Sequence, residues 1–170
     1  MRLTNLMKKI VRSIKRIPDV ILHPAKYFSA ADELWLDGIL VTFALVIATA
    51  LSKLSWSQLI GQPVTMGEAF SSSALNTAMA WTGFFAVYYF AMVIFRKQTN
   101  LADLFGAAGS AGFPLVLVTL ISALLWWLSA IFSIPVSIPA WSFIQNLFSW
   151  LGVALSWPGL MAFFIFRYRL

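Results

Sequence analysis

The chain has 170 residues, of which 61% are hydrophobic and 11% charged, with a formal net charge of +6. A water-soluble fold of this size could not bury so much apolar surface, so the composition predicts a membrane protein. The chain has no cysteine, which excludes disulfides, thiolate metal sites and a cysteine nucleophile.

The first 31 residues form a basic arm. Apolar residues from Leu3 to Ile17 recur at helical spacing, and Lys and Arg fill most of the other positions. Such a helix lies flat on an anionic leaflet, and the membrane-surface residues would be Arg2, Lys8, Lys9, Arg12, Lys15 and Arg16. Packing against the protein's own cytoplasmic face is the alternative. Nucleic acid is disfavoured because the basic run is short and lacks interleaved aromatic residues.

An interfacial segment follows, in which Pro24 opens a helical turn and Tyr27 and Phe28 suit the lipid–water boundary. The spacing of Ser29 and Asp32 then resembles a capping box that starts the first membrane helix. Domain 1–31 is therefore the arm with its interfacial segment, and domain 32–170 is the membrane part.

Apolar runs in the second domain predict transmembrane helices, because a span needs about 20 apolar residues. Their expected positions are about 36–54, 71–95, 114–132 and 141–166, with a loop over residues 55–69. Asp37 and Lys53 would extend to the interface from the ends of the first helix. The fold class is thus all-α: a polytopic bundle of four transmembrane helices with an N-terminal amphipathic interfacial helix.

The distribution of positive charge predicts the orientation of the bundle. Every Lys and Arg except Lys53 falls in the arm, in the connection after the second span or in the C-terminal tail. Cytoplasmic loops are the ones enriched in Lys and Arg, so both termini are expected in the cytoplasm.

The predicted spans offer no catalytic constellation, and we expect neither an enzyme nor a cofactor or metal site. Asp32, Glu33 and Asp37 cluster where acidic groups complement a helix dipole. Polar residues inside membrane helices more often bond a neighbouring helix than a substrate. The candidates for a polar pocket are Asn76, Gln145 and Asn146.

A segment rich in small residues precedes the third span, and it repeats them four residues apart. This spacing gives a smooth helix face that another helix can approach closely. The residues expected in helix packing, or in contact with a partner, are Gly106, Gly109, Ser110, Gly112 and Pro114.

Two stretches together resemble the Yip1 family of multi-pass membrane proteins. One is Ile21-Leu22-His23-Pro24-Ala25-Lys26-Tyr27-Phe28, before the first span, and the other is Gly109-Ser110-Ala111-Gly112-Phe113-Pro114-Leu115. The family usually has five spans, whereas this chain has room for four. The resemblance implies no enzyme activity. It implies either a trafficking factor like the eukaryotic members or a companion of a transport system like some prokaryotic ones.

The leading functional hypothesis is a non-enzymatic scaffold or accessory subunit of a membrane complex, in a bacterial cytoplasmic (inner) membrane. A small homo-oligomeric transporter or lipid-handling protein is one alternative, and a membrane-shaping factor is another. The expected partners are the lipid bilayer with its anionic headgroups and other membrane subunits or further copies of the chain, but no nucleic acid.

Overall fold

The computed structural model describes residues 3–30, 34–94 and 100–132, together with residues 143–144, 146–147, 150–152, 154–156 and 161. Within these ranges the regular structure is entirely helical, as the all-α prediction requires. The helices are α1 (Leu3–Arg16), α2 (Asp19–Leu22), α3 (Pro24–Ala30), α4 (Leu34–Leu59), α5 (Met66–Ile94), α6 (Leu101–Ala111) and α7 (Phe113–Ile131).

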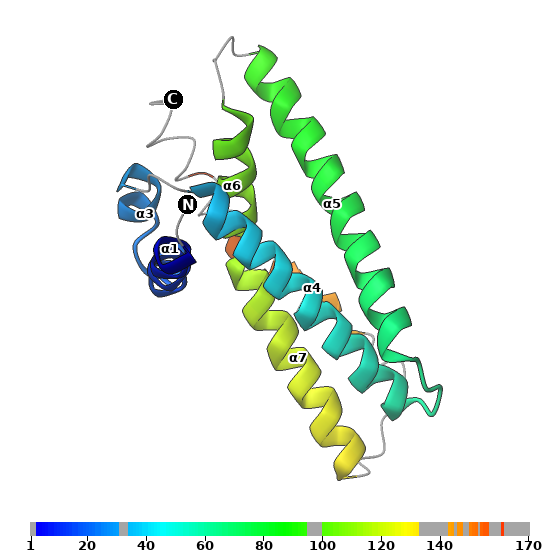
Figure 1. Ribbon diagram of the computed structural model, residues 1–170. Helices are drawn as coiled ribbons and strands as arrows, with labels where there is room; N and C mark the ends of the chain where they lie inside the picture. Colours follow the sequence, from blue (N-terminus) through cyan, green and yellow to red (C-terminus); the bar gives the residue numbers. More distant parts are fainter. Residues whose placement is uncertain are drawn as a thin grey trace.

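Helix α4 is the centre of the arrangement. It packs along α7 over most of its length, along α6 near its start, and against α5 on another side (Figure 1). The helices α1 and α3 gather beside the start of α4 (Figure 1). Ile17, which follows α1, joins a cluster of buried residues on the long helices: Val41, Leu45, Ala48 and Val116. The arm is therefore attached to the bundle by apolar packing as well as by the polar contacts described below.

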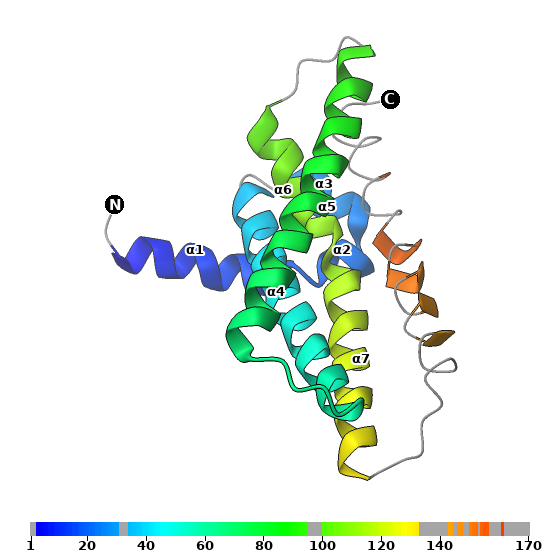
Figure 2. The same cartoon turned by 90° about the vertical axis from the view of Figure 1, so that its right-hand side faces the viewer.

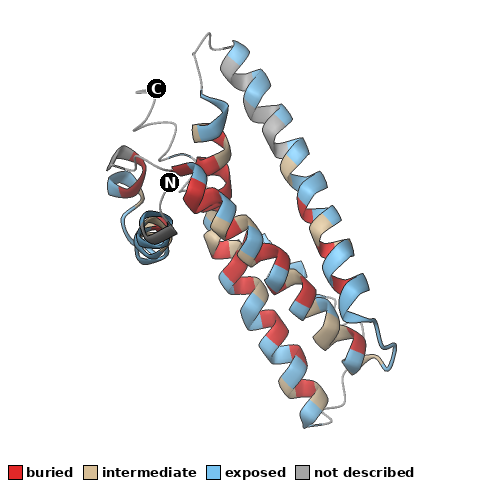
Figure 3. Ribbon diagram, viewed as in Figure 1, coloured by how far each residue is buried: buried red, intermediate tan, exposed pale blue. Residues whose placement is uncertain are grey.

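Among the residues that the structure describes, two helical stretches are long and apolar enough to cross a membrane, judged by length and composition. They are Leu34–Leu59 and Leu101–Ile131, the second comprising α6 and α7. Buried residues concentrate where α4 meets α6, and exposed residues line much of α5 (Figure 3). The predicted second span, 71–95, falls largely within α5, and the predicted fourth span, 141–166, lies mostly outside the described residues. A total of four spans thus stays a prediction.

The predicted loop over residues 55–69 is wrong in extent. Helix α4 continues to Leu59 and α5 already begins at Met66, so the connection is only residues 60–65. The turn is made at Gly61, whose φ of +68° favours glycine. The helical continuation is explained by apolar packing at this end, where the rings of Trp56 and Trp126 lie 5.2 Å apart.

Helix α5 begins with a capping box that was not among the features predicted from the sequence. The backbone N–H and the hydroxyl of Thr65 donate to the Glu68 carboxylate at 3.0 and 2.8 Å. The Glu68 N–H donates back to the Thr65 hydroxyl at 3.3 Å. The sequence signal was present, since Thr and Glu stand at capping-box spacing just before a helix.

Helices α6 and α7 are almost continuous. The Asn100 side chain caps α6 by accepting a hydrogen bond from the Ala102 N–H at 3.0 Å. Gly112 is both the last cap of α6 and the first of α7. Pro114 lies in the first turn of α7, where a missing N–H costs nothing.

Candidate functional site

Helices α4 and α6 pack very closely at a crossing lined by glycines. A Cβ at Gly38 would lie 2.7 Å from the Gly106 Cα, and a Cβ at Gly109 would lie 2.5 Å from the Gly38 Cα. A Cβ at Gly106 would overlap the backbone of Leu34. The two helices therefore meet backbone to backbone, which only glycine permits.

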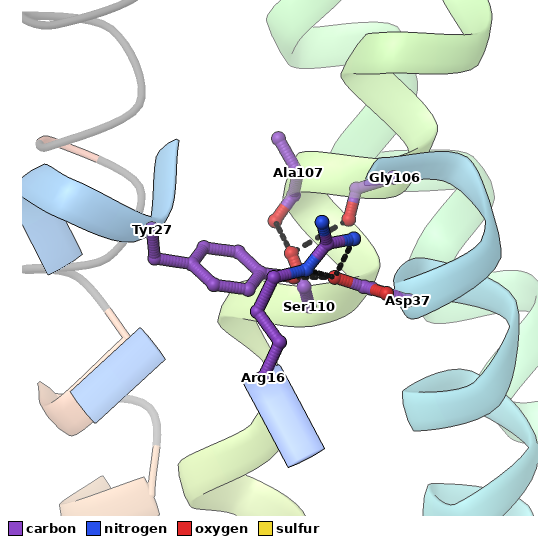
Figure 4. Close-up of polar contacts among 6 residues, drawn as sticks. All are labelled: Arg16, Tyr27, Asp37, Gly106, Ala107 and Ser110. Atoms are coloured by element: carbon purple, nitrogen blue, oxygen red, sulfur yellow. Dashed lines mark hydrogen bonds and ion pairs between the residues drawn. The ribbon is translucent and has the colours of Figure 1, made fainter. Parts of the chain in front are cut away.

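Ser110 lies in this crossing and is completely buried. Its hydroxyl donates to the Gly106 carbonyl at 2.8 Å and approaches the Ala107 carbonyl at 3.2 Å (Figure 4). The hydroxyl is thus satisfied within its own helix, so a polar side chain can be buried here without a large desolvation cost.

The polar centre of the site is Asp37, in the first turn of α4, whose side chain is 0% exposed. The Arg16 guanidinium from the end of α1 holds one of its carboxylate oxygens, with Nη2 at 2.8 Å and Nε at 3.0 Å. The Tyr27 hydroxyl from α3 donates to the same oxygen (Figure 4). We call these three residues the Asp37 cluster. It joins α1, α3 and α4 beside the crossing with α6.

Arg16 and Tyr27 also contact one another. The guanidinium carbon lies 5.7 Å from the centre of the Tyr27 ring, within range of a cation–π interaction. The Tyr27 ring packs edge-on against Phe28, with ring centres 4.9 Å apart. Burial raises the pKa of the Tyr27 hydroxyl well above its usual range, and the charge of Asp37 and its hydrogen bond raise it further. The phenol therefore stays a donor at any physiological pH.

The second carboxylate oxygen of Asp37, Oδ1, is buried and has no hydrogen-bond partner among the described residues. Burying a carboxylate costs free energy unless the charge is paired, so the contacts of Oδ2 with Arg16 and Tyr27 must offset most of that cost. The position of the arm therefore depends on both Arg16 and Tyr27. The chemistry of the cluster is thus structural: a charge, a counter-charge and a phenol hold three helices in one geometry.

Two predictions about the arm are corrected here. Arg16 is not a free membrane-surface residue, because it is committed to the buried Asp37 carboxylate, and Asp37 does not extend to the interface. Tyr27 and Phe28 are packed inside the protein instead of facing lipid, since only 2% and 0% of their surfaces are exposed. The reason is the return of α3 towards the start of α4, which pairs groups that the linear sequence separates.

The other predicted surface residues divide by exposure. Lys8, Arg12 and Lys15 are exposed and Lys9 is half-buried. Arg2 lies outside the described residues. Pro24 is half-buried and begins α3.

The predicted packing residues fall in the crossing or its continuation. Gly106 and Gly109 contact α4, Ser110 fills the crossing, and Gly112 and Pro114 are buried at the junction of α6 and α7. Helix α6 therefore approaches α4 as closely as small residues at this spacing allow.

The predicted polar pocket is not assembled within the described part of the chain. Asn76 is exposed on α5 and Asn146 is exposed in the C-terminal part, so neither lines a buried cavity. Gln145 lies outside the described residues.

The pairing of Asp37 with Arg16 and Tyr27 was not predicted from the sequence. The available signal was a carboxylate one turn inside an apolar helix, where an unpaired charge would be costly. Because 21 residues separate Arg16 from Asp37, helical spacing could not reveal the pair.

Comparisons with family models, with curated proteins and with solved structures give no match for this chain. The resemblance to the Yip1 family stays a prediction from its two motifs.

Proposed function

We propose that the chain is a non-enzymatic integral membrane protein that serves as a scaffold or accessory subunit of a membrane complex. The observation that carries this proposal is the apolar outer surface of helices α4 and α7. Large apolar side chains are exposed along both helices: on α4 they are Ile39, Phe43, Ile47 and Leu51, and on α7 they are Leu120, Ile121, Leu124 and Trp127.

This surface is typical of a protein in lipid. In the most apolar windows of the two candidate spans only 44% and 39% of residues are buried, whereas the core helix of a soluble protein is mostly buried. Monomeric soluble proteins rarely expose large continuous apolar patches. A bilayer supplies the apolar environment that these faces lack within the chain.

A structural role is favoured because the buried polar groups bond to one another and hold helices together. The fully buried carboxylate of Asp37 is engaged by Arg16 and Tyr27, which fix helices against one another. The neighbouring α4–α6 crossing is backbone contact rather than a cleft. Such a frame suits a protein that holds partners in position.

Membrane embedding is tested by carbonate extraction of membranes that contain the full chain. We expect the protein to remain in the pellet, and release into the supernatant would contradict the proposal. The scaffold role is tested by cross-linking in native membranes, followed by purification in mild detergent. Stoichiometric recovery with another membrane protein is expected, and recovery only as a lone monomer would count against it.

Orientation can be tested in the same membranes because the chain has no cysteine of its own. Asn5 lies in α1, and Gln62 lies in the α4–α5 connection at the far end of α4 (Figure 1). With cytoplasmic termini, a membrane-impermeant maleimide applied from outside should label Gln62→Cys. It should label Asn5→Cys only after permeabilisation. The reverse pattern would invert the proposed topology.

A homo-oligomeric transporter is the second candidate, and the exposed Asn76 favours it. A carboxamide on the outer surface of α5 would be costly in lipid unless another subunit covers it. The protein reconstituted at increasing density should then show solute flux that Asn76→Leu abolishes. Equal flux for both proteins, or none for either, would remove this candidate.

A further inference from the structure

Helix α1 carries a stripe of apolar side chains that are exposed among the described residues. Met7, Val11 and Ile14 are exposed by 57%, 48% and 57%. They recur at four- and three-residue spacing and so lie on one side of the helix. Ile21 and Leu22 add exposed apolar surface just beyond it, in α2.

The arm contacts the bundle through a different side. Ser13 and Ile17 are buried, and Arg16 is paired with Asp37. At about 100° per residue, Ser13 lies roughly 120° around the helix from Met7. The bundle therefore holds α1 by one side and leaves the apolar stripe free on another.

Two positive charges, Lys8 and Lys15, border the stripe on the side away from the bundle, and Arg12 lies further round the helix. Lys8, Arg12 and Lys15 are all exposed. By the same helical geometry, Lys8 and Lys15 lie about 80–100° from Met7, and Arg12 lies about 140° away. Long basic side chains at this angle can reach headgroups while the apolar residues between them and the bundle enter the acyl region.

We propose that the stripe Met7, Val11 and Ile14, with its bordering cations Lys8 and Lys15, is a docking surface for an anionic lipid leaflet. The inference rests on the proposed membrane embedding of α4 and α7. Charge complementarity selects this occupant, because an anionic surface satisfies the cations and the apolar stripe together. Figure 2 shows α1 running roughly across the direction of α4 and α7, as a helix lying along the surface would.

The Asp37 cluster gives this surface a fixed orientation. A flexibly tethered amphipathic helix can rotate freely, but Arg16 is bonded through two nitrogens to a carboxylate at the start of α4. The rotation of α1 about its own axis is thereby set relative to the bundle. The same contact that holds the arm also determines which of its sides faces the leaflet.

The test places the full chain, one copy per lipid nanodisc, with a fluorescent label on a single introduced cysteine. Quenching by nitroxides on the lipid acyl chains reports which positions enter the leaflet. In discs containing anionic lipid we expect strong quenching at Val11→Cys and Ile14→Cys. Weak quenching is expected at Arg12→Cys, a matched position on the same helix.

The second part of the test measures how quenching depends on charge. Quenching at Val11→Cys should fall in zwitterionic discs. In anionic discs it should also fall when Lys8→Gln and Lys15→Gln are added, since each neutralised cation weakens surface binding about fivefold. Equal quenching at Val11→Cys and Arg12→Cys, or no dependence on anionic lipid, would overturn the inference. The inference would also be overturned if the label at Val11→Cys were shielded from solvent only in discs that hold two copies of the chain. That result would assign the stripe to a contact with a second chain.

A label at Ile47→Cys, on the exposed side of α4, separates this inference from the proposed function. Quenching at Ile47→Cys without quenching at Val11→Cys contradicts the docking surface alone. The absence of quenching at Ile47→Cys contradicts membrane embedding itself.

Discussion

At the scale of single residues, Asp37 ties the N-terminal helices α1 and α3 to the start of α4. It is a fully buried carboxylate whose compensation comes from one guanidinium and one phenol, both on one oxygen. A buried ion pair adds little stability relative to apolar packing, but removing one partner leaves an uncompensated charge. Asp37 and Arg16 are therefore expected to be strongly coupled.

The coupling can be measured with a double-mutant cycle. Arg16→Gln should lower the free energy of unfolding by about 3 kcal/mol or more, because the Asp37 carboxylate stays buried without its counter-charge. Adding Asp37→Asn should restore part of that loss, since the buried charge is then removed. Unfolding in mild detergent, followed by tryptophan fluorescence, gives the values. Arg12→Gln on the exposed side of α1 is the control, and an equal effect of Arg12→Gln and Arg16→Gln would refute the coupling.

At the scale of helices, the crossing of α4 and α6 shows what the glycines do. Gly38, Gly106 and Gly109 each meet backbone of the opposite helix, whereas a Cβ at Gly83 on α5 would meet nothing within 4 Å. Glycine is therefore needed at the crossing, whereas the position of Gly83 has room for a larger side chain. At the crossing it permits contact, and on α5 it lowers helix propensity without any contact in return.

Two matched substitutions separate these roles. Gly106→Ala should force α4 and α6 apart and destabilise the protein by about 1–3 kcal/mol, the usual effect of overpacking. Gly83→Ala should be neutral or stabilise the protein by up to about 1 kcal/mol through helix propensity. Thermal unfolding of both variants in the same detergent compares them directly. A Gly106→Ala protein as stable as Gly83→Ala would contradict the close crossing.

At the scale of the whole molecule, apolar surface faces both inward and outward. The inward faces of α4, α6 and α7 form the packed interior, while the outward faces of α4 and α7 remain exposed. The arm adds a second, smaller apolar surface bordered by cations. This combination is what the proposed arrangement, a bundle in a bilayer with a helix at one leaflet, would require.

A charge at the outward face distinguishes a membrane bundle from a soluble one. Ile47 lies near the middle of α4 and is 39% exposed. In a spanning helix, Ile47→Lys should cost about 2.5–3.5 kcal/mol of insertion free energy. An insertion assay should then show a lower membrane-integrated fraction, while Gln58→Lys near the end of α4 inserts normally. Normal insertion of Ile47→Lys would contradict the lipid-facing assignment.

Local sequence patterns determined much of the described fold. Helical periodicity predicted α1, long apolar runs predicted α4 and α7, and Asn100 and Pro114 marked the starts of α6 and α7. Small-residue spacing identified α6 as a close-packing helix. These features could be predicted because each depends on residues within a turn or two of one another.

Only the tertiary structure decided which of these elements meet. It buried Tyr27 and Phe28, brought Arg16 to Asp37, and chose Gly38 as the opposite side of the α6 crossing. It also determined which side of α1 is free, since α1 is apolar on more than the side that the bundle covers. The physical reason is that burial and charge pairing depend on contacts between helices distant in sequence, whereas periodicity reports only what a single helix can present.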